Sequence, residues 1–159
     1  IIRGKKREFI SAIGKSLNIL LPIEANTSTQ SDKLSAIWLS PDEWMIYSNE
    51  TCDENTNNYE TEEILNNNIS KLNLGAITDV TDQFVMINLK GNKIYELFQT
   101  GSPLNFNNFK NKKGAVTQTI LNKIDIIVHN HDKNAVNLFV RRSFSQHLFS
   151  WMIDAASRL

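Results

Sequence analysis

Residues 36–47 contain two short apolar runs separated by a polar turn, and this feature constrains the fold most. Residues 36–39 and 44–47 are rich in aliphatic and aromatic side chains, and the turn between them reads Ser40-Pro41-Asp42-Glu43. Proline presets the backbone of a turn, and serine and aspartate hydrogen-bond to nearby backbone groups. Aromatic and β-branched residues favour strands. The segment therefore predicts a β-hairpin, which requires antiparallel sheet.

Four segments carry apolar residues at the spacing of a helix face. They are the stripe Phe9, Ile13 and Leu17; the stripe Leu65, Ile69 and Leu72; the group Ile94, Leu97 and Phe98; and the C-terminal set Phe144, Leu148, Trp151, Met152 and Ala155. Thr61 is predicted to cap the second helix. Ser143 and Gln146 have the spacing of a capping box at the start of the last helix.

Beyond the hairpin, four segments are typical of strands, namely 84–89, 115–121, 124–129 and 136–140. Polar segments predict loops at 26–33, 49–59 and 105–113 and a turn at 130–134. Because helices and strands do not alternate strictly, the fold class expected is α+β, with small antiparallel sheets and packed helices. A length of 159 residues suits one domain, 1–159, with division into lobes at about 1–75 and 76–159 as an option.

Composition excludes several classes of function. The chain has 17 basic and 17 acidic residues and a formal net charge of zero, whereas proteins that bind nucleic acid need a clustered positive surface. The sequence has no apolar run of the roughly 18–20 residues that span a membrane. Its one cysteine rules out an intrachain disulfide. We therefore expect a soluble, cytoplasmic protein that binds neither nucleic acid nor membrane.

The candidates for metal binding and nucleophilic catalysis are weak. His129 and His131 are two residues apart and could reach one ion from a strand, but no third ligand has a diagnostic spacing, so an exposed hairpin tip is favoured. Cys52 is followed by Asp53 and Glu54, whose carboxylates would raise the pKa of a thiol nucleophile.

Asp79 and Asp82 could form an acid/base pair at the entry to the strand 84–89, although turn bonding accounts for both. The sequence contains neither of the glycine-rich patterns Gly-x-Gly-x-x-Gly and Gly-x-x-x-x-Gly-Lys-Ser/Thr, so no phosphate-binding loop is indicated.

Four residues are candidates for binding a partner. Trp38 and Trp44 flank the predicted turn, and at least one of them is expected in the core. Arg141 and Arg142 are adjacent at a strand end and point to opposite faces, so one can serve the fold while the other meets a carboxylate or an anionic ligand. We expect alanine substitutions of the two arginines to separate, one lowering the melting temperature and the other weakening only partner capture.

Five motifs in order along residues 36–156 resemble the gamma subunit of heterotetrameric sarcosine oxidase. The matching segments are Trp38–Trp44, Asp79–Gln83, Leu89–Gly91, Gly101–Asn105 and Phe139–Phe144, with Trp151 and Asp154 in register behind them. The chain departs from the family pattern at Gln83, Ser102 and Asn105, where arginine, cysteine and aspartate are usual.

The resemblance implies lobes like those of the folate-binding aminomethyltransferases (T-protein). It also implies a non-catalytic, structural subunit of a complex that oxidatively demethylates sarcosine to glycine. The expected partners are the alpha, beta and delta subunits, alpha most directly. The expected cofactors, FAD, FMN, NAD, tetrahydrofolate and zinc, belong to those subunits, and none is expected on this chain.

Two alternatives remain open. A small folate-dependent enzyme of the aminomethyltransferase type would need a carboxylate near the folate, and Asp79, Asp82 and Asp125 are the acids near strand ends. A stand-alone folate-sensing or assembly factor would share the fold outside any oxidase. Genes for the other three subunits beside this one would dismiss that second alternative.

Overall fold

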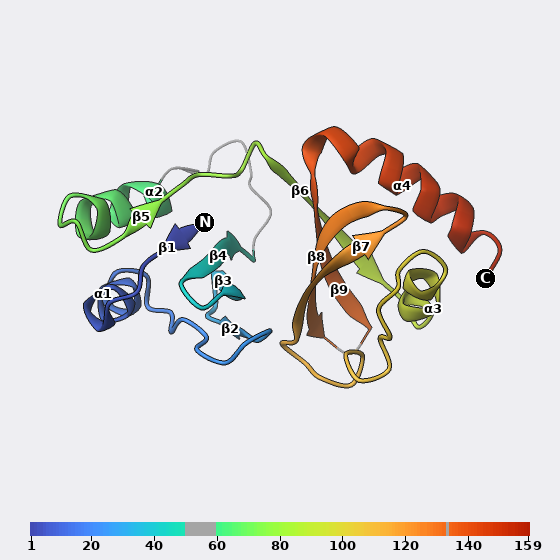
Figure 1. Cartoon of the computed structure of the whole chain (residues 1–159), viewed down its shortest axis with the longest axis horizontal. Coiled ribbons are helices and arrows are strands. Elements are labelled where there is room, and N and C mark those ends of the chain that lie inside the picture. Colours follow the sequence, from blue (N-terminus) through green and yellow to red (C-terminus); the bar gives the residue numbers. More distant parts are fainter. Residues whose placement is uncertain (50–59, 133) are drawn as a thin grey trace. The chain divides into compact units, whose positions relative to one another are not determined.

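The computed structural model describes residues 1–49, 60–132 and 134–159. They form two compact units, Ile1–Asp79 (unit 1) and Val80–Leu159 (unit 2). Each unit contains one antiparallel sheet with helices packed on it (Figure 1). The expected combination of small antiparallel sheets and packed helices is thus confirmed. Apart from Asn49, the predicted loop 49–59 lies outside the described residues.

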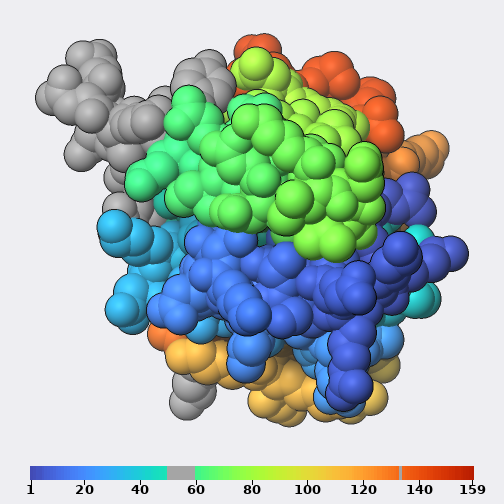
Figure 2. All heavy atoms as spheres, turned by 90° about the vertical axis from the view of Figure 1, so that its left-hand side faces the viewer, coloured from blue at the N-terminus to red at the C-terminus, as the bar shows by residue number. Residues whose placement is uncertain are grey.

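Unit 1 has a five-stranded sheet of order β2-β3-β4-β1-β5. The strands are β1 (Ile2–Arg3), β2 (Ser28–Gln30), β3 (Leu34–Ser40), β4 (Glu43–Ser48) and β5 (Ala76–Ile77), and the helices are α1 (Arg7–Leu17), α2 (Glu60–Leu65) and the π-helix η1 (Asn66–Ser70). The pair β3–β4 is the predicted hairpin. Its turn is held by the Ser40 hydroxyl, which donates to Asp42 Oδ1 at 3.0 Å. Figure 2 shows α1 beside the α2–η1 segment.

Phe9 is the centre of the unit 1 core and is fully buried. Its ring centroid lies 6.0 Å from that of Trp44. Two glycines make room for it, because a Cβ atom at Gly4 would lie 2.5 Å from Phe9 Cγ. A Cβ atom at Gly75 would lie 2.6 Å from the same ring and 2.5 Å from the Arg3 carbonyl oxygen. The residues next to β1 and β5 can therefore pack against the Phe9 ring only because they are glycines and have no side chain.

Two predictions in unit 1 need correction. The segment 26–33 is not wholly a loop, because β2 pairs with β3 through backbone bonds that its polar side chains did not signal. Thr61 is not an N-cap, because the helix already begins at Glu60. From Asn66 the helix widens to a π-helix, and the Asn68 side-chain amide donates to the Ile64 carbonyl at 2.9 Å. Leu72 follows this distortion and is 63% exposed.

Unit 2 has a four-stranded sheet of order β6-β9-β8-β7. Its elements are β6 (Phe84–Lys90), α3 (Ile94–Gln99), β7 (Val116–Leu121), β8 (Ile124–Asp132), β9 (Ala135–Arg141) and α4 (Arg142–Ala156). Asn122 and Lys123 join β7 to β8 with φ of 49° and 65°, the signature of a tight I′ turn. Both helices pack on one face of the sheet, where side chains such as Leu148 and Leu138 form the core.

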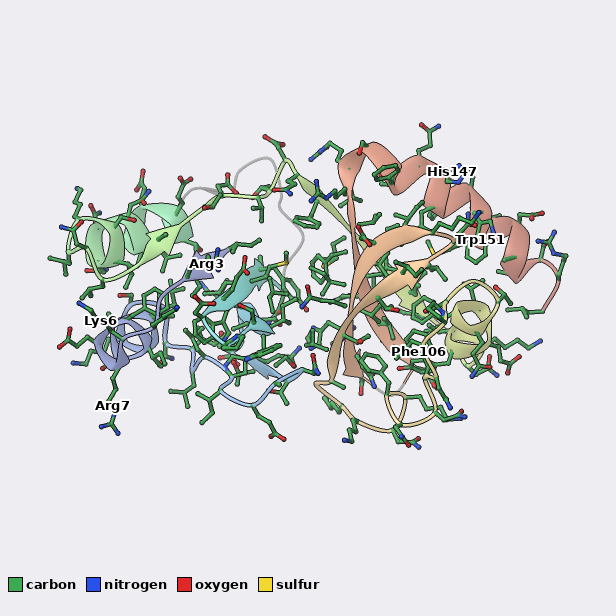
Figure 3. All side chains as sticks on the ribbon, in the orientation of Figure 1. Arg3, Lys6, Arg7, Phe106, His147 and Trp151 are labelled. Carbon is green, nitrogen blue, oxygen red and sulfur yellow. The ribbon has the colours of Figure 1, made fainter. Side chains whose placement is uncertain are left out.

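Asn130 ties the irregular segment 105–114 to the sheet. It was predicted in a turn, but β8 continues to Asp132 and leaves Asn130 1% exposed. Its side-chain amide donates to the carbonyl oxygens of Phe109 and Lys112 at 3.0 and 2.9 Å. Phe106 (Figure 3) anchors the same segment, with its ring centroid 5.1 Å from that of Phe98.

The start of α4 also differs from its prediction. The helix begins at Arg142, directly after β9, and Arg141 is the capping residue, without a side-chain bond. Ser143 therefore lies inside the first turn and is not a cap. Of the predicted inner face, Leu148, Met152 and Ala155 are buried, while Phe144 is 48% exposed. Among the described helices, none is long and apolar enough to cross a bilayer.

We predict opposite effects for alanine at two glycines of unit 1. Gly75→Ala forces a Cβ atom against backbone and the Phe9 ring, so the free energy of unfolding falls by about 1–3 kcal/mol. Gly14 lies inside α1 with only an ordinary contact of 3.7 Å, so Gly14→Ala raises it by roughly 0.5–1 kcal/mol. Urea unfolding of both variants measures the difference, and equal effects would contradict the close packing around Phe9.

Candidate functional site

The two adjacent arginines at the end of β9 have different surroundings. The Arg142 backbone N–H donates to the Gln83 carbonyl at 2.8 Å. Its side chain donates from Nε to the Asp82 carbonyl at 2.7 Å, and its Nη2 lies 3.4 Å from both the Thr81 carbonyl and Asp82 Oδ1. Arg142 therefore fastens the start of α4 to the segment that leads into β6.

The carbonyl contacts carry most of this attachment. The ion pair between Arg142 and Asp82 joins two exposed side chains, and such pairs contribute little in water. The segment that Arg142 contacts is a turn, and a 2.9 Å hydrogen bond from the Gln83 N–H to the Val80 carbonyl closes it. The sequence motifs 79–83 and 139–144, 56 or more residues apart, are thus joined in one contact. Asp82 serves this contact, which favours the turn interpretation of the aspartate over an acid/base role.

Arg141 instead lines a hollow on the face of the sheet opposite α3 and α4. Phe139 shares its face of β9, and the register places Phe84 beside Arg141 and Ile127 beside Phe139. The hollow has a volume of about 540 Å³. Its lining consists of Phe84, Gln118, Thr119, Ile120, Asp125, Ile126, Ile127, Phe139 and Arg141. Within the described residues, the Arg141 side chain makes no ion pair or hydrogen bond.

The two tryptophans belong to unit 1 and differ in exposure. Trp44 is 2% exposed, and its indole N–H donates to the Pro22 carbonyl at 2.7 Å. Trp38, its cross-strand neighbour, packs against the same core and is half-buried. Trp44 presents no surface to a partner, so Trp38 is the tryptophan that could contact one.

His129 is fully buried, which corrects the expectation of an exposed hairpin tip at this position. Burial lowers its pKa to about 4, with a smaller contribution from His131, whose ring centroid is 6.4 Å away. Its imidazole is therefore neutral at pH 7. In the described part of the chain, no three His, Cys, Asp or Glu side chains are grouped to hold a metal ion. Cys52 lies outside the described residues.

Sequence reasoning missed the apolar side of the hollow. Phe139 and Arg141 share a strand face by their spacing of two, but the neighbours Phe84 and Ile127 depend on strand order and register. Asp125 was singled out only as an acid near a strand end, and the structure places it in the hollow with Arg141. Strand pairing between distant segments is the signal that would have found these residues.

We predict that the two arginines differ in their effect on stability. Arg142→Ala removes the bonds to the Asp82 and Thr81 carbonyls and lowers the free energy of unfolding by about 1 kcal/mol. The Arg141 side chain makes no hydrogen bond or ion pair with the described residues, so Arg141→Ala leaves the free energy of unfolding within about 0.5 kcal/mol of wild type. Chemical denaturation checks both, and a larger loss at Arg141 would contradict the assignment.

We also predict that stability declines in mild acid because of His129. Its pKa is lower in the folded chain than the ordinary value near 6.5, so the unfolded chain binds the proton more tightly. Stability from this group is complete above about pH 6.5 and is lost as the pH falls toward 4, by up to roughly 3 kcal/mol.

Denaturation at a series of pH values measures this loss. His129→Gln should flatten the curve between pH 6.5 and about 4.5. A curve for His129→Gln that parallels wild type would show that another group titrates.

Comparison with known proteins shows the family and the fold of this chain. A search of solved structures finds a chain of heterotetrameric sarcosine oxidase from Corynebacterium sp. U-96 in complex with pyrrole 2-carboxylate, with a TM-score of 0.85 and 18% identity. The match covers 99% of this chain and 77% of that one and shows a shared fold. No curated protein matches by sequence. The family model described as sarcosine oxidase, gamma subunit family, matches residues 4–158, so the chain belongs to that family.

Proposed function

We propose that this chain is the gamma subunit of a heterotetrameric sarcosine oxidase, which oxidatively demethylates sarcosine to glycine. The family match over residues 4–158 carries the proposal. The similar solved structure, itself a chain of a heterotetrameric sarcosine oxidase, supports it. In this role the chain associates with alpha, beta and delta subunits, alpha most directly, and works in the cytoplasm.

The role proposed is structural, without a catalytic centre on this chain. Three of its conspicuous polar groups serve the fold: Arg142 holds the turn before β6, Asn130 holds the segment 105–114, and His129 is buried and neutral. We propose that FAD, FMN, NAD, tetrahydrofolate and zinc are held by the other subunits. We also propose that the two units are related to the lobes of folate-binding aminomethyltransferases.

One observation favours a second candidate, a small folate-binding enzyme of the aminomethyltransferase type. The hollow of unit 2 combines the aromatic rings of Phe84 and Phe139 with the carboxylate of Asp125. A pterin ring could stack on such walls and bond to the acid. Calorimetric titration of the isolated chain with tetrahydrofolate distinguishes the two candidate functions. Micromolar binding would favour the enzyme over the structural subunit.

We predict that the tagged chain, co-expressed with the alpha, beta and delta subunits encoded in the same genome, purifies with all three. The complex should carry flavin absorbance and oxidise sarcosine. The chain expressed alone should show no flavin absorbance and no sarcosine turnover, because the proposal puts both on the other subunits.

Either signal from the isolated chain would overturn the structural role. A complex of alpha, beta and delta that assembles at full yield, with the tagged chain left unbound, would overturn the assignment as a subunit.

A further inference from the structure

We propose that unit 2 binds one water molecule in its interior, and that this water links the Tyr95 hydroxyl to the Asn130 side-chain oxygen. The water joins three parts of unit 2, namely the helix α3, which carries Tyr95, the strand β8, which carries Asn130, and the segment 105–114. All three lie within one unit, and the inference does not depend on the proposed function.

Tyr95 supplies a buried hydrogen-bond donor. Its ring lies against the rings of Phe106 and Phe109, with centroid distances of 6.1 and 6.3 Å. Its hydroxyl oxygen is buried and has no hydrogen-bond partner in the part of the chain that the structure describes. Burial raises the pKa of Tyr95 to about 12, so the hydroxyl keeps its proton at pH 7. The hydroxyl therefore requires an acceptor.

Asn130 supplies a buried acceptor and uses its donors elsewhere. The residue is 1% exposed. Its Nδ2 atom donates to the carbonyl oxygens of Phe109 and Lys112 at 3.0 and 2.9 Å, which uses both amide hydrogens. Exchanging the two ends of the amide would place Oδ1 against these carbonyl oxygens, so the contacts fix its orientation. The Oδ1 atom is buried and has no partner among the described residues, so it requires a donor.

The Lys110 carbonyl is a second acceptor at the same place. It lies 3.4 Å from Asn130 Nδ2, farther than the carbonyls of Phe109 and Lys112. An amide group has two hydrogens, so it cannot donate fully to three carbonyls. The Lys110 carbonyl therefore makes the weakest of the three bonds and can accept a further hydrogen.

Phe109 brings the two buried groups to the same part of unit 2. Its carbonyl accepts the Asn130 bond, and its ring meets the Tyr95 ring edge to face, at an interplanar angle of 70°. Phe106 lies beside α3 in Figure 3 and also contacts the Tyr95 ring. Aromatic rings thus surround Tyr95 along the segment 105–114, and Asn130 is the buried polar side chain bonded to that segment.

One water molecule matches this set of groups. It accepts a hydrogen bond from the Tyr95 hydroxyl and donates its two hydrogens to Asn130 Oδ1 and the Lys110 carbonyl. Buried waters typically make about three hydrogen bonds to polar groups that have no other partner, and proteins hold about one per 27 residues. An unpaired buried polar group is costly, so a ligand that satisfies a donor and two acceptors together stabilises unit 2.

A high-resolution crystal structure of the full chain tests the site directly. We expect density for one water within about 2.7–3.2 Å of Tyr95 Oη, Asn130 Oδ1 and the Lys110 carbonyl oxygen. In the Tyr95→Phe variant this water loses a bond, and its density should weaken. A direct hydrogen bond between Tyr95 and Asn130, separate waters on the two groups, or no water at either group would overturn the proposal.

Unfolding equilibria measure the same link in solution. Tyr95→Phe removes the hydroxyl alone and should raise the equilibrium constant for unfolding by about fivefold to tenfold. In an Asn130→Ala background, the same substitution should raise it by less than about twofold, because the water has already lost its other partner. Equal factors in the two backgrounds would show that the two groups share no ligand.

Thr100→Val is the matched control, since it also removes a hydroxyl group close to α3. The Thr100 hydroxyl donates to the Leu97 carbonyl at 2.7 Å and takes no part in the proposed link. Its effect should be the same in wild type and in Asn130→Ala. If Asn130→Ala does not fold, the crystal structures of wild type and Tyr95→Phe decide the proposal by themselves.

Discussion

Unit 2 depends on β9, the last strand in the sequence, occupying a central position in its sheet. Residues 135–141 pair with β6 on one side and β8 on the other. The β6 pairing joins Phe84 to Arg141, so it brings distant segments together and must offset a large loss of chain entropy. Four apolar residues of β9 are buried and supply the compensating apolar burial, namely Val136, Leu138, Phe139 and Val140. The contacts of Arg142 then fix the strand end at the turn before β6.

This arrangement gives the neighbouring residues Arg141 and Arg142 different roles. Because β9 runs directly into α4, Arg142 turns away from the strand and bonds to the 81–83 segment, whereas Arg141 keeps the strand alternation and stays on the sheet face with Phe139. The fold thus holds the Arg141 guanidinium at a fixed place on the sheet, where it makes no hydrogen bond or ion pair with the described residues.

Local patterns predicted the elements whose signals lie in neighbouring residues. The hairpin 36–47, the stripe of Phe9 and Ile13, and the strand 84–89 all formed as the spacing indicated. The sequence-based predictions were wrong where tertiary contacts determine the local structure. Ser143 has the sequence of a cap, but the continuous path from β9 moves the helix start to Arg142. His129 and Asn130 have the polarity of a turn, yet β8 carries them into the buried part of the sheet. The hollow could not be predicted because its walls meet only through the order β6-β9-β8-β7.

Hydrogen–deuterium exchange of the chain and of its Arg142→Ala variant tests the central claim most directly. The bonds from the Arg142 side chain to the Asp82 and Thr81 carbonyls hold the turn before β6, so the variant should exchange faster in peptides covering residues 80–86 and 139–144. Peptides covering residues 124–132, in the interior strand β8, should exchange at the wild-type rate. Unchanged exchange at residues 80–86 in the variant would contradict the account.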